Sequence, residues 1–231
     1  MSALHSSSTV FDSALFRDAF GTAAMRHIFS DRSLVERYVE VEIALAQAQA
    51  RCGVIPAEAA QAIARESRTD LLDWELLRHE TDNVGYPILP LVHQLVHQCG
   101  EAGKYVHWGA TTQDIMDTAN VLQVRAALDL VAGDLVELRG ILRQLARKHR
   151  DTAMAGRTHL QQALPVTFGY KVAIWLAMFD RHQQRLAELR ARVLVVQFAG
   201  AAGTLASLGT EGLKVQEALA AELELGIPAT T

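Results

Sequence analysis

The chain has 231 residues, of which 50% are apolar and 21% are charged, as in an ordinary globular protein. Its formal net charge of -4 argues against a nucleic-acid-binding surface as the main function. Few prolines and an abundance of Ala, Leu, Glu, Gln and Arg favour helix throughout. No run of residues approaches the ~20 consecutive apolar positions of a membrane-spanning helix, so we expect no membrane partner.

The two cysteines, Cys52 and Cys99, are isolated and form neither a disulfide framework nor a CxxC metal pair. The first ten residues, MSALHSSSTV, have neither the basic start nor the apolar core of a signal peptide. Together these observations predict a protein of a reducing, cytoplasmic compartment.

The start of the chain predicts short and medium helices. Residues 11–29 mix aromatic and charged side chains and predict one or two short helices. Ser33-x-x-Glu36 has the spacing of a capping box and predicts a helix over residues 34–51. Its apolar residues recur at helical intervals, so we expect one buried face. That face comprises Leu34, Tyr38, Val41, Leu45 and Ala48.

We expect three further helices before the first long one, over residues 57–65, 70–78 and 88–99. Residues 80–87, ETDNVGYP, are rich in turn-forming types and predict a turn before the last of these helices. Because Gly100 and Gly103 end that helix, we place a domain boundary near Gly103. The boundary separates a small N-terminal helical domain, residues 1–103, from a long-helix domain, residues 104–231.

Residues 107–119, HWGATTQDIMDTA, form a turn of small and hydroxyl residues that runs into an apolar-periodic segment. Thr111-x-x-Asp114 has the spacing of a capping box, with Asp in the acidic place, and predicts a helix start. The first turn of a helix has unpaired N–H groups and the positive end of the helix dipole, so it can hold an anion. On local grounds the segment is either an ordinary capped helix start or a carboxylate-binding corner.

The two longest periodic segments predict a helical hairpin. Residues 115–149 contain a heptad seam, which needs a partner helix beside it. The seam comprises Val124, Leu128, Val131, Leu135, Leu138, Leu142 and Leu145. A short polar link over residues 151–164 contains GRTHLQQAL, and Pro165 then opens a second long helix over residues 166–196. A third helix is expected over residues 211–225.

Three motifs, HWGATTQDIMDTA, GRTHLQQALPVTFG and FAGAAGTLASLG, occur in this order. They resemble the fumarase/aspartase superfamily of β-elimination enzymes, as does the opening FSDRSLVERYVEVEIALAQAQARCGVIPAEAA. The segments YPILPLVHQL and KYVHWGATTQDIMDTA most resemble 3-carboxy-cis,cis-muconate cycloisomerase, with adenylosuccinate lyase next. The resemblance covers nearly the whole chain and corresponds to the N-terminal half of a family member. It implies an all-α fold, in which a small helical domain precedes part of a long-helix bundle.

The resemblance implies a cofactor-free lyase or cycloisomerase acting on a small polycarboxylate. Such enzymes remove a proton next to a carboxylate and expel a leaving group from the β-carbon, or run the reverse reaction, lactonisation. Negative charge builds on that carboxylate, so fixed hydrogen-bond donors lower the barrier. The residues expected to bind the substrate are His107, Thr111, Thr112, Asp114, Arg157 and Gln162. The implied catalytic residues are Thr158 and His159, with His159 protonating the leaving group or positioning an acid.

Three departures from the family patterns leave alternatives open. Some muconate cycloisomerases carry Trp where this chain has His159, so the His favours a lyase with a true leaving group. Adenylosuccinate lyase is such an enzyme, but its usual Thr-x-His-Asp segment is replaced here by residues 80–87. The family's Ser-containing loop, GSSxMPxKxNP, supplies the general base and does not occur before Thr231. We therefore expect a truncated or cleaved chain that is inactive alone, or a non-catalytic helical oligomerisation fragment.

Members of the resembled family are homotetramers, and the heptad seam suits a shared helical bundle. The resemblance implies that the His107–Asp114 corner and the Arg157–Gln162 corner meet through different subunits. His93 and His97 lie four residues apart on one predicted helix face, but no third ligand is evident, so we expect no metal site.

Overall fold

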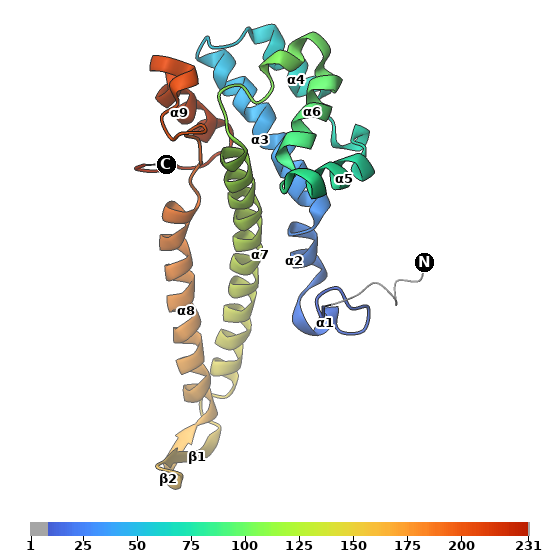
Figure 1. Ribbon diagram of the computed structural model, residues 1–231. Helices are drawn as coiled ribbons and strands as arrows, with labels where there is room; N and C mark the ends of the chain where they lie inside the picture. The colour runs from blue at the N-terminus through green and yellow to red at the C-terminus, as the bar shows by residue number, and fades with distance from the viewer. Residues whose placement is uncertain (1–8, 231) are drawn as a thin grey trace. The chain divides into compact units, whose positions relative to one another are not determined.

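A computed structural model describes residues 9–230 and divides the chain into two compact units. The first unit comprises Met1–Ala126 and Val193–Thr231, and the second comprises Ala127–Arg192. The division falls within α7 (Thr112–Lys148) and near the end of α8 (Phe168–Val193) (Figure 1). The all-α expectation is confirmed, with one two-stranded hairpin added. No helix within residues 9–230 is both long and apolar enough to cross a membrane.

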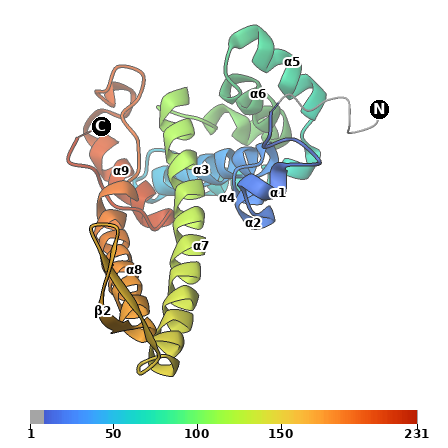
Figure 2. The same cartoon turned by 90° about the horizontal axis from the view of Figure 1, so that it is seen from below.

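The first unit is built around α3 (Asp31–Arg51), which contacts α4 (Ala57–Glu66) and α9 (Gly212–Glu222) (Figures 1 and 2). Its other complete elements are α1 (Arg17–Phe20), α2 (Ala23–Ile28), η2 (Thr69–Leu71), α5 (Trp74–Val84), α6 (Ile88–Cys99), η3 (Gly100–Tyr105) and η4 (Ala206–Glu211). The helix expected over residues 88–99 is confirmed at both ends.

Helix α3 begins three residues earlier than predicted, and its cap is Ser30 rather than Ser33. The Ser30 backbone is extended, and its hydroxyl oxygen accepts a hydrogen bond from the Ser33 N–H at 3.2 Å. A serine with this geometry satisfies one of the free N–H groups of the first turn. Ser30, Asp31 and Ser33 are all N-cap residue types, so the sequence pattern alone did not distinguish the possible helix starts.

The prediction of a single buried face on α3 was incomplete. Four of the five expected residues are buried, and only Leu34 is half-buried. The adjacent face, one residue further around the helix, is buried as well, through Val35, Val39, Glu42, Ala46 and Gln49. A helix enclosed by neighbours on more than one side loses its amphipathic pattern. Two polar side chains, Glu42 and Gln49, therefore lie inside the unit.

The turn predicted over residues 80–87 is wrong for most of its length, because α5 continues to Val84. Asp73 caps this helix, and its carboxylate accepts a hydrogen bond from the Leu76 N–H at 2.9 Å. The Thr81 hydroxyl donates to the Leu77 carbonyl at 2.7 Å within the helix, so its polarity is satisfied without a turn. Gly85, with φ of 92°, ends the helix in the left-handed conformation that glycine favours.

In the second unit, the polar link expected over residues 151–164 is a β-hairpin instead. Strand β1 (Ala153–Thr158) pairs antiparallel with β2 (Gln161–Thr167), and α8 begins at Phe168 rather than near Pro165. Pro165 therefore lies in a strand, opposite Ala155 and beside a bulge. A Cβ on Gly156 would lie 2.4 Å from the Leu164 carbonyl oxygen, so the bulge needs glycine there.

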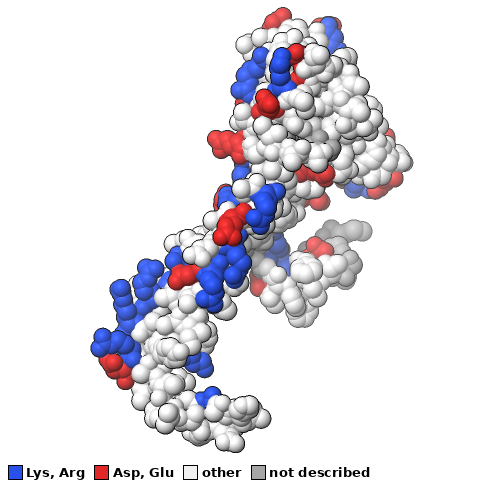
Figure 3. Space-filling view, turned by 90° about the vertical axis from the view of Figure 1, so that its left-hand side faces the viewer, with Lys and Arg blue, Asp and Glu red and all other residues white. Residues whose placement is uncertain are grey.

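Helix α8 runs back beside the second half of α7 (Figure 1). Ion pairs link the two helices, from Arg190 to Asp129 at 2.6 Å and from Arg139 to Asp180 at 2.5 Å. On the face shown in Figure 3, basic side chains gather along this helical hairpin. Exposed basic residues near the end of α7 are Arg143, Arg147, Lys148 and Arg150.

Candidate functional site

The first polar corner is the turn between η3 and α7. His107 has a φ of 59° and Gly109 a φ of 71°, so the chain passes twice through the left-handed region before the helix starts. The Ala110 N–H donates to the His107 carbonyl at 3.3 Å and closes the turn. Thr111 and Thr112 are both half-buried at the first turn of α7. Their hydroxyls thus lie where a long helix presents free N–H groups.

Asp114 holds this corner to a distant segment of the same unit. Its carboxylate accepts a hydrogen bond from the Thr111 N–H at 2.9 Å, which is the acidic half of the predicted capping box. It also accepts from the Ala199 N–H at 2.9 Å and the Gly200 N–H at 3.0 Å. The residue is only 1% exposed. Asp114 therefore has a structural role, and its role as a substrate ligand stays a prediction.

Residues 196–200, at the start of the third motif, are fastened to α7 and α9 by side chains. The Thr118 hydroxyl donates to the Gln197 carbonyl at 2.9 Å and accepts from the Gln197 N–H at 3.0 Å. The Gln216 side-chain amide donates to the Phe198 carbonyl at 2.8 Å. No site residue was predicted in this segment, because contacts across about eighty residues leave no local spacing in the sequence.

Two glycines allow these segments to approach closely. A Cβ on Gly109 would lie 3.0 Å from the Leu208 side chain, and a Cβ on Gly200 would lie 3.2 Å from the Gly109 carbonyl oxygen. The first and third motifs are thus packed backbone against backbone. Glycine is therefore required at these two positions both for its small size and for its positive φ.

A buried carboxylate of α3 supports the same corner. The Glu42 side chain is 1% exposed, and its Oε1 lies 2.6 Å from Nδ1 of His107, which is 19% exposed. Two helical turns further along, the Gln49 amide donates to the Trp108 carbonyl at 2.6 Å. Burial lowers the pKa of His107, but the hydrogen bond and charge of Glu42, with the charge of Asp114, outweigh it, so the pKa is raised. Neither Glu42 nor Gln49 was predicted to contribute.

The second polar corner lies at the tip of the β-hairpin. Arg157 pairs with Gln162, and Thr158 pairs with Gln161. Directly opposed residues share a face and successive residues alternate, so Arg157 and Gln162 lie on one face and Thr158 on the other. His159 forms the two-residue turn with Leu160, and their φ values are 43° and 63°. Arg157, Thr158, His159 and Gln162 are all exposed.

The predicted site residues thus fall into two sets. The structure brings His107, Thr111, Thr112 and Asp114 together in the first unit. It brings Arg157, Thr158, His159 and Gln162 together in the second unit. The first set can offer hydroxyl, imidazole and helix N-terminal donors to an anion. The second set offers a basic side chain, an amide, a hydroxyl and an imidazole that can transfer a proton.

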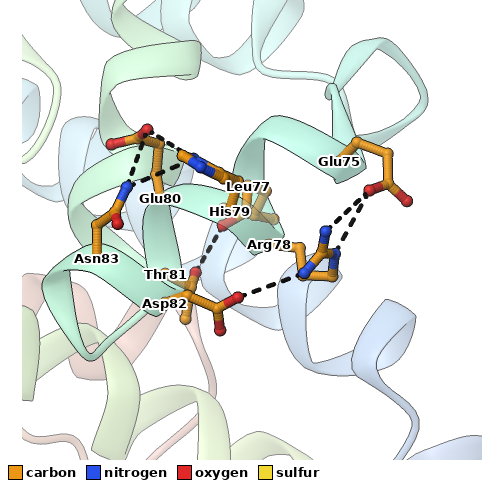
Figure 4. Close-up of polar contacts among 8 residues, drawn as sticks. All are labelled: Glu75, Leu77, Arg78, His79, Glu80, Thr81, Asp82 and Asn83. Atoms are coloured by element: carbon orange, nitrogen blue, oxygen red, sulfur yellow. Dashed lines mark hydrogen bonds and ion pairs between the residues drawn. The ribbon is translucent and has the colours of Figure 1, made fainter.

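Residues 80–83, the first half of the stretch that stands in place of the adenylosuccinate lyase segment, engage mainly in contacts within α5 (Figure 4). His79 contacts Glu80 at 3.2 Å, and Arg78 contacts Asp82 at 3.3 Å. A groove of about 590 Å³ lies alongside, with His93 and His97 in its lining. Among residues 9–230, no group of three His, Cys, Asp or Glu side chains is placed to hold a metal ion.

Hydrogen bonds thus hold the turn before α7, the start of α7 and the glycine-rich segment together. We compared the chain with known protein families. The family model described as lyase matches residues 19–231. The chain therefore belongs to the lyase family, within the fumarase/aspartase superfamily.

Particular relatives are informative. Trans-aconitate decarboxylase 1 of Mycosarcoma maydis is 50% identical over 90% of this chain and 42% of its own length. The 3-carboxy-cis,cis-muconate cycloisomerase of Pseudomonas aeruginosa is 48% identical over 93% of this chain and 48% of its own length. A crystal structure of fumarate lyase from Mesorhizobium sp. BNC1 matches with 62% identity and a TM-score of 0.87, covering 90% of this chain and 49% of that one. The chain spans about half the length of the relatives it matches.

Proposed function

We propose that this chain provides part of the active site of a cofactor-free lyase or cycloisomerase that acts on a small polycarboxylate. The reaction abstracts a proton next to a carboxylate and eliminates at the β-carbon, or runs in reverse as lactonisation. A reaction like that of 3-carboxy-cis,cis-muconate cycloisomerase is our first candidate. Two of the relatives carry names that refer to polycarboxylates, which supports this substrate class.

The observation that carries the proposal is the corner at the start of α7. Loss of the proton places extra negative charge on the neighbouring carboxylate. His107, Thr111 and Thr112 are donors fixed on a rigid turn, beside the positive end of a long helix. Donors that are already in place need no reorganisation when the charge develops, so they lower the barrier.

We assign proton transfer to the leaving group to His159, with Thr158 beside it. Arg157 and Gln162 share a hairpin face and add a charge and an amide for a second carboxylate of the substrate. Asp114 stays a proposed substrate-binding residue, and its carboxylate also orders the first corner. The general base is assigned to no residue of this sequence, because the 231 residues contain no match to the family's Ser-containing loop.

An adenylosuccinate lyase-like C–N lyase, releasing fumarate, is the second candidate. The observation in its favour is His159, since a true leaving group needs a proton donor. The third candidate is a non-catalytic oligomerisation fragment.

We also propose a cytoplasmic location for the protein, because both of its cysteines are free thiols.

We further propose that copies of the chain assemble as a homotetramer. Within the second unit, apolar side chains are exposed on both helices, which favours a shared bundle. These side chains are Val136 and Ile141 on α7 and Ile174 and Met178 on α8. Light scattering coupled to size-exclusion chromatography tests this, and a monomer at micromolar concentration contradicts it.

Turnover of candidate substrates tests the proposed activity. The protein is incubated with 3-carboxy-cis,cis-muconate, adenylosuccinate and simple substituted succinates, and ultraviolet absorbance is followed. If a substrate is consumed, His159→Ala is expected to reduce kcat by about 100-fold or more. Undiminished kcat removes His159 from the mechanism. If no substrate is consumed, titration calorimetry with the same compounds distinguishes a chain that binds the substrate but lacks the general base from an oligomerisation fragment that does not bind it.

A further inference from the structure

Glu42 is a buried carboxylate to which the sequence assigned no role. It lies in the middle of α3, its side chain is 1% exposed, and it contacts His107, which is 65 residues away in sequence. Its second oxygen, Oε2, is buried without a hydrogen-bond partner in the described part of the chain. A buried carboxylate is destabilising unless it is paired. Its presence therefore needs an explanation beyond packing.

The contact fixes which ring nitrogen of His107 is free. Nδ1 lies 2.6 Å from the carboxylate and donates to it, because an ionised carboxylate can only accept. No hydrogen bond is found for Nε2 within residues 9–230. In a neutral imidazole with its proton on Nδ1, Nε2 is an acceptor and repels a carboxylate. In an imidazolium, Nε2 carries a proton and can donate to a carboxylate.

The surroundings favour the imidazolium. The charged groups that face His107 are Glu42 from α3 and Asp114 from α7, and both are negative. They outweigh the effect of burial, so the pKa of His107 is raised. The His107 backbone is also held in the left-handed region, at φ of 59°, by the turn hydrogen bond to Ala110. The Gln49 contact to the Trp108 carbonyl fixes the adjoining residue.

We propose that Glu42 is a positioning residue that keeps His107 as an imidazolium, so that its Nε2–H, with Thr111 and Thr112, receives a substrate carboxylate. This inference rests on the proposed function, since it assumes a polycarboxylate ligand. It goes further by assigning the charge state of His107, the ring nitrogen that faces the substrate, and a supporting residue of α3.

The first measurement is the titration of His107 in the 231-residue chain. Histidine is labelled with ¹³C and ¹⁵N, and the His107 signal is assigned by its loss in His107→Gln. The wild-type signal is expected to titrate above an ordinary histidine, with ¹⁵N shifts that place a proton on both ring nitrogens at pH 7. Glu42→Gln keeps a hydrogen-bond acceptor but removes the charge, and should lower the proton affinity of His107 by about tenfold or more.

The second measurement is the binding of tricarballylate, a saturated tricarboxylate that cannot undergo the proposed elimination. At pH 7, Glu42→Gln should bind it about tenfold more weakly than wild type, and the difference should shrink as the pH falls and His107 regains its proton. A merely structural role for Glu42 would not give this pH dependence. Glu80→Gln is the matched control, because it removes an exposed carboxylate from His79 and should change neither measurement.

The outcomes separate the two proposals. If wild-type His107 titrates at or below the ordinary histidine value, the role of Glu42 is overturned, whether or not the Glu42→Gln variant folds. If His107 titrates high but tricarballylate does not bind, the polycarboxylate function is overturned and the carboxylate-receiving role falls with it. If His107 titrates above an ordinary histidine and tricarballylate binds tightly in a Glu42-dependent manner, both the polycarboxylate function and the role of Glu42 are supported.

Discussion

The carboxylate of Asp114 accepts a hydrogen bond from the backbone N–H of Gly200 at 3.0 Å, across 86 residues of sequence. The same side chain accepts from Thr111 and Ala199. One buried charge thus holds the turn that starts α7 to the glycine-rich segment after α8. The donors of the first corner are ordered by this contact rather than by the turn alone.

Asp114→Asn should destabilise the first unit by about 2–3 kcal/mol, because an amide NH₂ replaces one oxygen that now faces N–H donors. Urea unfolding followed by circular dichroism measures the loss. Asp134→Asn is the control, since Asp134 is exposed on the same helix and its replacement should change stability by less than about 0.5 kcal/mol. Equal effects of the two substitutions would show that the Asp114 contacts contribute little.

Gly200→Ala should also destabilise the first unit, and for two reasons. The φ of 73° is unfavourable for alanine by about 1–2 kcal/mol, and the new Cβ would lie 3.2 Å from the Gly109 carbonyl oxygen. Gly203→Ala isolates the first reason, because its φ is 75° and no atom lies within 4 Å of the added Cβ. Thermal unfolding should therefore give a larger loss for Gly200→Ala than for Gly203→Ala. The reverse order would contradict the close approach of the two motifs.

Periodicity in the sequence predicted the long helices and placed α6 correctly, because each has apolar residues at helical intervals. It did not find the second buried face of α3. Single-helix patterns assume one solvent side, whereas α3 has neighbours on several sides. Glu42 therefore lies outside the face that the periodicity predicted to be buried. The contacts of Glu42 with His107 and of Asp114 with Gly200 join distant segments, and no local spacing encodes them.

The β-hairpin was missed for a different reason. Residues 161–167, QQALPVT, show no apolar alternation, and every residue of β2 except Thr167 is exposed. Strand pairing here depends on the cross-strand register and on Gly156, which only the three-dimensional structure reveals. The site residues of the second motif were identified by resemblance alone. Their division between two hairpin faces could not be predicted without the register.

Leu160→Gly should stabilise the hairpin, because Leu160 has a φ of 63° and its side chain is fully exposed. Two-residue hairpin turns of this kind favour glycine, so a gain of about 0.5–1 kcal/mol is expected in the unfolding of the second unit. Hydrogen exchange of the β1 and β2 amides should slow in the variant. Val166→Gly, in the regularly paired part of β2 opposite Met154, is the control and should speed exchange, since glycine weakens a strand interior. Faster exchange in Leu160→Gly would mean that the Leu160 side chain supports the turn.

Stability should fall as the pH rises above neutrality, through the Glu42–His107 pair. The folded-state pKa of His107 is raised, so the stabilisation is fully present below the unfolded value of about 6.5 and is lost as the pH rises through the folded value. Urea midpoints at constant ionic strength between about pH 6 and pH 9 measure this window. His107→Gln lacks the titrating ring and should lose less stability over the same range. Parallel pH profiles for wild type and His107→Gln would show that the pair does not couple folding to protonation.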